Sequence, residues 1–164
     1  FKRAGIKHDF TKKWKRNREH FKKWMDGETG VPFIDACMRE LKLTGYLSNR
    51  GRQNVASFFT KDLGLEWWWG AMYFESQLID YEVCSNWGNW NYLAGIGTDP
   101  REDRYFNPVS QAKKYDSQAE FIKYWVPELA GIENDILIEI NELHLSLPED
   151  VNYPKIPIQK NKKW

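Results

Sequence analysis

The 164-residue sequence contains only two cysteines and three histidines. Cys37 and Cys84 stand far apart, and the histidines at 8, 20 and 144 are scattered, so neither residue type has the spacing of a metal site. The sequence therefore argues against a structural zinc site, and we predict no bound metal. We expect both cysteines to be reduced core residues, as in a soluble protein of a reducing intracellular compartment.

Long apolar runs are also missing. No segment approaches the roughly 20 apolar residues that span a bilayer, and the opening FKRAGIKHDF lacks the apolar stretch of a signal peptide. We therefore predict neither a membrane partner nor a targeting segment. The two-residue alternation typical of half-buried strands is absent as well, which argues against a β protein.

Aromatic residues, by contrast, are abundant at 16%, and the net charge of +1 is unevenly distributed. Residues 1–24 hold ten Lys or Arg and two acidic residues, with interleaved aromatic side chains at Phe1, Phe10, Trp14, Phe21 and Trp24. Such a segment could follow a phosphate backbone. It could also be a solvated helix face with its aromatic side chains packed inward, and charge alone favours this second interpretation.

Glycine and proline separate successive amphipathic segments, which predicts one all-α domain without an internal boundary. In the segment that starts at Pro32, apolar residues recur at helical spacing before Gly45. A Pro- and Lys-rich irregular tail is expected over 146–164. The predicted helices cover about residues 9–25, 32–44, 51–63, 67–81, 117–130 and 133–145.

Residues 48–58 (SNRGRQNVASF) form the first unusually polar segment. Asn49, Arg50, Arg52, Gln53 and Asn54 begin a helix whose later turns are apolar. Amide and guanidinium groups would thus reach the rim of a core, where a polar ligand can be bound.

Residues 78–92 (LIDYEVCSNWGNWNY) form the second. Asp80 and Glu82 end an apolar helix, and a carboxylate near a core requires a cation or hydrogen-bond donors. We predict that Asp80 pairs with Arg52. On the residues alone, this pair is either a ligand site or a buried ion pair that only fixes the register of the helices.

The nine tryptophans form the third feature. Most single tryptophans are large core residues, but a series of closely spaced indoles can also pass an oxidising equivalent stepwise. They lie at Trp14, Trp24, Trp67, Trp68, Trp69, Trp87, Trp90, Trp125 and Trp164.

Residues 29–108 (from TGVPFIDACMRELKLTGYLSNRGRQNVASF to GTDPREDRYFNP) closely resemble the flavin-binding domain of cryptochromes and photolyases. SNRGRQNVASF and GTDPREDRYFNP are similar to the DASH branch, and the likeness extends over about 10–158. The resemblance implies that residues 1–164 are part of an FAD-binding domain and fold as its C-terminal half. An N-terminal antenna domain and the first part of the flavin domain would then lie outside this chain, where a separate chain could supply them.

The resemblance also implies site residues. It places Asn49, Arg52, Asp80, Glu82 and Asn86 around the isoalloxazine and ribityl parts of FAD. Asn86 would face flavin N5, and because an amide is not an acid, a photoreduced flavin would stay anionic. Trp90, Trp67 and Trp14 would be the proximal, middle and surface members of an electron-transfer chain.

Repair-type members of the family act on cyclobutane pyrimidine dimers flipped out of DNA, and the DASH branch resembles those that prefer single-stranded substrates. Asn49, Arg50 and Gln53 would lie near the DNA-facing mouth. Tyr92 falls where some repair enzymes present a tryptophan to the lesion.

Three functions remain open on the sequence. The first is a light-driven, photolyase-like flavoprotein that is complete only with its N-terminal part. The second is a truncated remnant without bound flavin or catalysis. The third is a helical module that binds single-stranded nucleic acid through residues 1–24 and the arginines near position 50.

Overall fold

The computed structural model describes residues 14–97, 104–142, 145, 147–161 and 164. Within them the backbone forms helices and a single isolated bridge, between Lys15 and Leu65, and no strand, which confirms the predicted all-α class. The helices are α1 (Arg18–Asp26), α2 (Pro32–Thr44), α3 (Asn49–Ser57), α4 (Trp67–Gln77), α5 (Val83–Leu93), α6 (Pro108–Tyr115), α7 (Glu120–Trp125) and α8 (Asn134–Glu139), with a π-helical turn η1 (Phe58–Asp62) and a 3-10 turn η2 (Pro127–Leu129).

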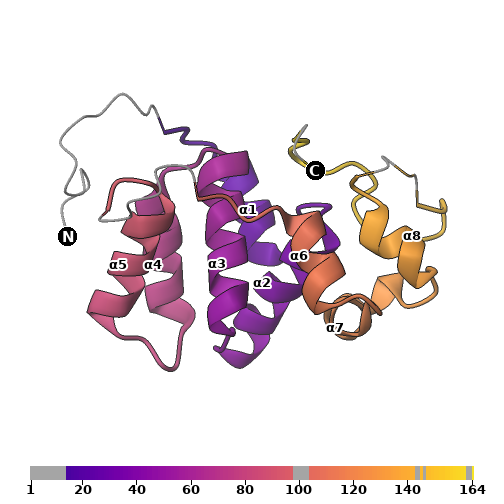
Figure 1. The fold of residues 1–164 in the computed structure, drawn as a ribbon, viewed down its shortest axis with the longest axis horizontal. Coiled ribbons are helices and arrows are strands. Elements are labelled where there is room, and N and C mark those ends of the chain that lie inside the picture. The colour runs from indigo at the N-terminus through magenta and orange to yellow at the C-terminus, as the bar shows by residue number, and fades with distance from the viewer. Residues whose placement is uncertain (1–13, 98–103, 143–144, 146, 162–163) are drawn as a thin grey trace.

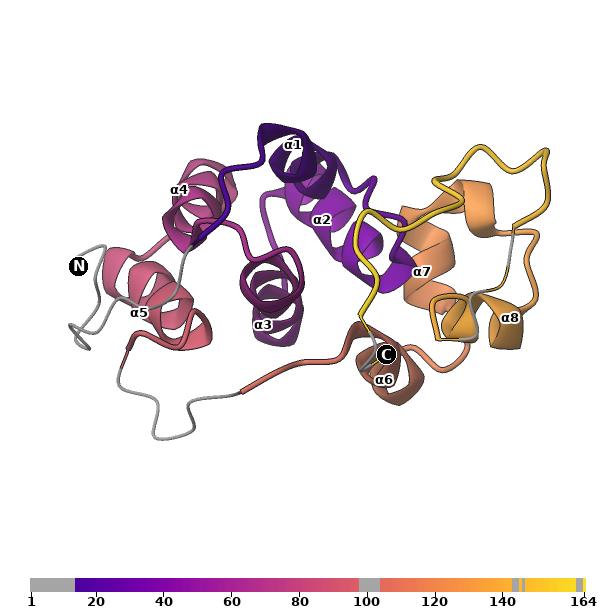
Figure 2. The ribbon, with the colours of Figure 1, turned by 90° about the horizontal axis from the view of Figure 1, so that it is seen from above.

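Helices α4 and α5 lie side by side at one end of the molecule, and α7 and α8 lie at the other (Figure 1). Between the two ends stand α2 and α3, and α1 packs along α2 (Figure 2). Helices α3 and α5, which both begin with polar residues, thereby come into contact.

The first predicted helix begins later than expected. Residues 14–17 are not helical, because the backbone of Lys15 bonds to Gly64 and Glu66 instead. The Asn17 side chain then caps α1 by accepting a hydrogen bond from the backbone N–H of His20. The earlier part of the prediction, residues 9–13, lies outside the described residues.

The second predicted helix is confirmed as α2, which ends at Gly45 in the left-handed region. The third begins at Asn49 behind the Ser48 cap and continues through η1. Helix α4 ends at Gln77 rather than at residue 81, because the backbone turns extended at Leu78.

Helices α5 and α6 were not predicted, because their segments contain glycine and proline punctuation. Each is capped by a side chain: Glu82 accepts bonds from two backbone N–H groups of α5, and Asn107 does the same for α6. Capping and burial against α4 outweigh the low helix propensity of the glycine within α5. Further along, Pro127 divides the segment predicted as one helix over 117–130 into α7 and η2.

Trp24 is the centre of an aromatic core. Its fully buried indole lies 4.6 Å from the ring centroid of Phe59 and 6.1 Å from those of Phe74 and Trp90. Phe21 also packs against this core. Among the described residues of the basic segment 1–24, these aromatic side chains thus point inward, as the second interpretation of that segment requires.

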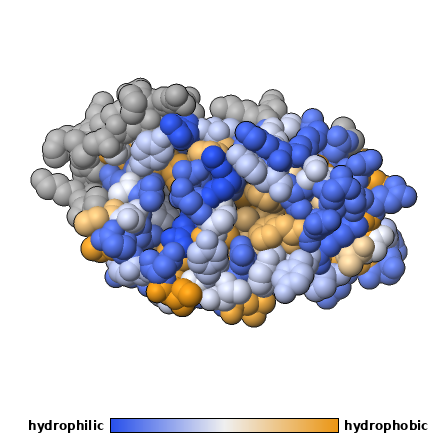
Figure 3. All heavy atoms as spheres, turned by 60° about the horizontal axis from the view of Figure 1, so that its bottom comes forward, coloured by the Kyte–Doolittle hydropathy of each residue, from blue (hydrophilic) through white to orange (hydrophobic). Residues whose placement is uncertain are grey.

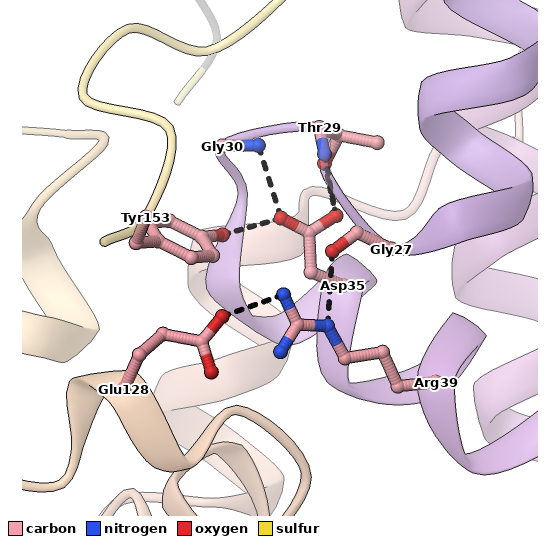
Figure 4. Close-up of polar contacts among 7 residues, drawn as sticks. All are labelled: Gly27, Thr29, Gly30, Asp35, Arg39, Glu128 and Tyr153. Atoms are coloured by element: carbon pink, nitrogen blue, oxygen red, sulfur yellow. Dashed lines mark hydrogen bonds and ion pairs between the residues drawn. The ribbon is translucent and has the colours of Figure 1, made fainter. Parts of the chain in front are cut away.

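The tail is irregular where it is described, as predicted, and a buried carboxylate holds it in place. Asp35 accepts hydrogen bonds from Tyr153 of the tail, from both the backbone and hydroxyl of Thr29, and from the backbone of Gly30 (Figure 4). Burial raises the pKa of Asp35 to about 6, although these bonds favour the ionised form. Beside it, Arg39 donates a hydrogen bond to the Gly27 carbonyl and forms an ion pair with Glu128 of η2.

Cys37 is buried and free, as expected, but Cys84 is exposed, so the prediction of a core position was wrong for Cys84. Cys84 lies in the first turn of α5, on a side of the helix that faces solvent. Within the described part of the chain, no cluster of His, Cys, Asp and Glu suited to a metal ion occurs. None of the helices that the structure describes is long and apolar enough to cross a membrane.

Candidate functional site

A cavity of about 370 Å³ lies between α3, α4 and α5. Its wall combines apolar side chains with hydrogen-bonding groups, which is the usual make-up of a site for an organic ligand. The apolar part comprises Leu47, Ala56, Phe74, Leu78, Trp90 and Leu93, and the other lining residues are Tyr46, Asn49, Arg52, Gln53, Asp80, Glu82, Ser85, Asn86 and Asn89.

Arg52 and Asp80 meet at the rim of this cavity, as the sequence predicted. One guanidinium nitrogen, Nη2, donates to both carboxylate oxygens of Asp80 at 2.8 Å. The backbone bond from Ile79 to Gly45, 2.9 Å long, fixes the loop that carries Asp80 against the start of α3.

The pair is not buried, which is a correction to one of the two interpretations. The Asp80 side chain is 48% exposed and that of Arg52 is 26% exposed. Ion pairs in such a position contribute only about 0–1 kcal/mol to folding. Within this chain, the pair therefore adds little to the stability of the fold.

Arg52 is held in place by more than its carboxylate partner. Its Nε donates to the Leu47 carbonyl at 2.6 Å, and its guanidinium lies over the Tyr46 ring, 5.7 Å from the centroid. Within the described part of the chain, Nη1 carries no hydrogen bond. This nitrogen is therefore available to an acceptor in the cavity.

Asn86 presents a fixed amide to the same space. Its Nδ2 donates to the Ala71 carbonyl of α4 at 2.9 Å, and the residue is only 7% exposed. This bond uses one of the two N–H donors and fixes the amide plane, so that Asn86 can offer its amide oxygen to a ligand as an acceptor.

Glu82 lines the cavity and also caps α5. Its carboxylate accepts hydrogen bonds from the backbone N–H groups of Cys84 and Ser85 at 3.0 and 2.6 Å, which hold the pKa of Glu82 below its ordinary value. An ionised carboxylate therefore remains at the N-terminus of α5, where the helix dipole favours it.

The three residues predicted at the DNA-facing mouth divide into two groups. Asn49 and Gln53 line the cavity, whereas Arg50 does not. Arg50 donates to Gln53 at 2.9 Å, and its guanidinium lies 5.5 Å from the ring centroids of both Phe106 and Tyr115. It therefore points along the surface toward α6.

The predicted indole series begins at the cavity. Trp90 forms part of its wall and is 2% exposed, and its ring packs on the backbone of Gly70 in α4. Trp67 lies one turn earlier on α4 and is also buried. Trp14 precedes α1 and packs against the core, and the backbone of its neighbour Lys15 bonds to the segment before α4.

The sequence reasoning missed Tyr46, Ser85 and Asn89. Ser85 and Asn89 follow the helical spacing that also brings Asn86 and Trp90 to the cavity. Recognition of α5 as a helix would therefore have identified them. Tyr46 precedes the polar segment and carried no such pattern.

The residues present fit a flavin. An apolar back wall suits the faces of a flat ring system, and the rim supplies a cationic donor at Arg52, an amide acceptor at Asn86 and the anionic group of Asp80. On the face seen in Figure 3, hydrophobic groups stand among hydrophilic ones. Ile79 and Val83, the sequence neighbours of the lining residues Asp80 and Glu82, are 79% and 50% exposed.

Residues 2–163 match the family described as the FAD binding domain of DNA photolyase. Curated relatives include the cryptochrome DASH of Natronomonas pharaonis, 54% identical over 161 residues, and that of Xenopus laevis, 52% identical over 157. These matches cover 94% and 92% of this chain but 34% and 30% of the relatives. The chain thus spans about a third of the length of those proteins.

Solved structures agree. The crystal structure of the Synechocystis sp. cryptochrome has a TM-score of 0.85 and 47% identity, and the match covers 97% of this chain and 34% of that one. The photolyase of Sulfolobus tokodaii, solved with two FAD molecules, has a TM-score of 0.82 and 40% identity, and the match covers 92% of this chain and 33% of that one. The family has FAD as its cofactor, as predicted, and this chain belongs to the FAD-binding domain family of photolyases and cryptochromes.

Proposed function

We propose that the cavity between α3, α4 and α5 binds the flavin ring of FAD, and that the chain is the flavin-binding part of a blue-light flavoprotein of the DASH type. The observation that carries this proposal is the convergence of Asn49, Arg52, Asp80, Glu82 and Asn86 on one cavity with Trp90 in its wall. When bound, the flavin supplies light-driven one-electron chemistry.

The residues of the chain have distinct tasks in this proposal. Arg52, oriented by Leu47 and Asp80, offers its free Nη1 to an acceptor of the ligand, and Asn86 offers an acceptor oxygen. Trp90 closes the apolar wall and excludes water. Trp90, Trp67 and Trp14 pass an oxidising equivalent outward, since indole is the most easily oxidised of the common side chains.

The test is to purify the chain with added FAD and to record its absorption after desalting. A structured flavin band that survives desalting supports the proposal, and colourless protein contradicts it. Trp90→Phe should retain the band but lose photoreduction under blue light. The matched control is Trp125→Phe, a half-buried tryptophan on α7 that contacts Tyr124, and it should be photoreduced like the wild type.

We further propose that other segments complete the cavity wall, supplied by the same protein or by a separate chain. The support is the open rim at Asp80, the exposed Ile79 and Val83 beside it, and the length of the relatives. A polypeptide that corresponds to the preceding part of the Natronomonas pharaonis relative should tighten FAD binding when it is added. Unchanged affinity would contradict this.

For the DNA partner, we propose that Asn49, Arg50 and Gln53 mark the mouth at which a lesion in single-stranded DNA enters for repair. Arg50 and Lys114 supply positive charge, and the half-exposed Tyr115, near both cations, supplies a ring on which a base can stack. Two measurements test the proposal: the salt dependence of binding to an oligonucleotide that contains a pyrimidine dimer, and the conversion of that dimer to the repaired bases under light. If colourless protein binds oligonucleotides equally well, the chain is a nucleic-acid-binding module without flavin chemistry.

A further inference from the structure

Trp67 has an indole neighbour that the proposed series does not include. The ring centroids of Trp67 and Trp87 lie 5.8 Å apart in an edge-to-face arrangement. Trp67 is 1% exposed, whereas Trp87 is only partly buried at the edge of the core. Because α4 and α5 pack side by side (Figures 1 and 2), this contact leads from a buried indole directly to one that reaches solvent.

Trp87 also has a proton acceptor. Its Nε1–H donates to Oε2 of Glu75 at 3.0 Å, within the range of about 2.6–3.2 Å over which a carboxylate can take a proton directly. Glu75 is exposed on α4, so that a proton which it receives can pass to water. The hydroxyl of Tyr81 interacts with the same indole and carboxylate.

This arrangement suits an indole that loses an electron. When Trp67 is oxidised, Trp87 can reduce it across the short ring contact and becomes a radical cation. That cation is a much stronger acid than the neutral indole, and it transfers its Nε1 proton to the Glu75 carboxylate. One electron and one proton leave Trp87, and a neutral indole radical and a protonated Glu75 remain. Loss of the proton makes the return of the electron less favourable.

We propose that Trp87 is a second exit from Trp67, parallel to Trp14, and that Glu75 accepts its proton. The inference rests on the proposed function, since the oxidant that begins the sequence is a photoexcited oxidised flavin in the cavity. It adds that the path divides at Trp67 and that one branch includes a built-in base.

The experiment follows indole radicals by transient absorption in the flavin-loaded protein after a light flash. With two parallel exits, Trp14→Phe and Trp87→Phe should each slow photoreduction only a few-fold, and the double variant should lose far more than either. Glu75→Gln keeps a hydrogen-bond acceptor but removes the base, so in the Trp14→Phe background it should slow the change from cationic to neutral radical by about 100-fold. Trp125→Phe is the control.

The outcomes separate the two hypotheses. If the wild type binds flavin but shows no photoreduction, the proposed function is wrong and the branch falls with it. The other case is a wild type that is photoreduced, a Trp14→Phe variant that is not, and a Trp87→Phe variant that behaves like the wild type. In that case only the branch is wrong.

A measurement without flavin tests the proton acceptor independently. In the flavin-free chain, the indole N–H signal of Trp87, assigned by its loss in Trp87→Phe, should shift in nitrogen-15 NMR as carboxylates are protonated. The shift should disappear in Glu75→Gln, while the other indole signals stay as in the wild type. A Trp87 signal that titrates identically in Glu75→Gln would overturn the assignment of Glu75.

Discussion

The indole of Trp90 lies directly against the backbone of Gly70. A β-carbon at position 70 would stand 2.2 Å from Cη2 and 2.5 Å from Cζ3 of that ring. No real side chain tolerates such a contact, so the position of Trp90 in the cavity wall requires a glycine on α4. The position of Trp90, which forms part of the cavity wall, therefore depends on the absence of a side chain at Gly70 of α4.

Gly70→Ala should displace Trp90 and destabilise the fold. We expect a loss of about 1–3 kcal/mol, the usual cost of overpacking a core, together with weaker FAD binding. Denaturant unfolding and a flavin titration measure both effects. Gly131→Ala is the matched control, because nothing lies within 4 Å of its β-carbon position, and it should change stability by less than about 0.5 kcal/mol. Equal stability of the two variants would contradict the close contact.

Arg52→Lys should separate ligand binding from folding. Because the pair with Asp80 is exposed at the rim, the free energy of unfolding should fall by no more than about 1 kcal/mol. Loss of a charge-assisted hydrogen bond to the ligand costs about 1.5–3 kcal/mol, so the dissociation constant for FAD should rise by at least about tenfold.

Arg16→Lys is the control for that change, since the Arg16 side chain is 66% exposed and forms an ion pair with Glu66 away from the cavity. It should have a similarly small effect on stability and leave FAD affinity as it is. A large loss of stability in Arg52→Lys with unaltered flavin affinity would assign the pair to folding alone.

Asn86→Asp should destabilise the protein increasingly as pH rises. The variant loses the donor to Ala71 and places a carboxyl group at a position that is 7% exposed, where burial favours the neutral form. Loss of the bond to Ala71 costs about 1–3 kcal/mol of unfolding free energy. Above the pKa of the new carboxyl group, its buried charge lowers the stability further. Urea unfolding across the pH range measures the trend. Asn89→Asp, at an exposed position of the same cavity, should lack it.

Asp35 should make stability depend on pH in the weakly acidic range. Its folded pKa of about 6 lies above the unfolded value near 3.9, so folding favours the protonated form. Its contribution is complete below the unfolded pKa and is lost as pH rises through about 6, by about 3 kcal/mol in total.

Comparison with Asp35→Asn isolates this contribution from those of other groups. The difference in unfolding free energy between wild type and variant should change with pH between about 4 and 6 and level off on both sides. The variant should be less stable than the wild type at every pH, because its amide cannot accept all the hydrogen bonds that Thr29 and Tyr153 donate to Asp35. A pH-independent difference would show that Asp35 titrates at its ordinary value.

The sequence by itself determined the helical class and much of the cavity. Helical spacing and the Pro32 and Gly45 signals defined α2, and the polar residues before an apolar run marked the start of α3. The pair of Arg52 with Asp80 also followed from the sequence, because an acidic residue at the end of an apolar helix needs a cation. Such features depend on the chemistry of nearby residues and so are visible along the chain.

Tertiary structure decided what depends on contacts between distant segments. Helix α5 forms despite its glycine because, in addition to the local cap by Glu82, Trp90 is buried against Gly70 of α4, a contact between segments distant in the sequence. The rim position of the Arg52 and Asp80 pair arises only when the loop after α4 packs against the start of α3. The contact of Trp67 with Trp87 arises only when α4 and α5 pack together. Packing sets distances and exposure, and these quantities determine whether an ion pair stabilises the fold and where an indole can pass an electron.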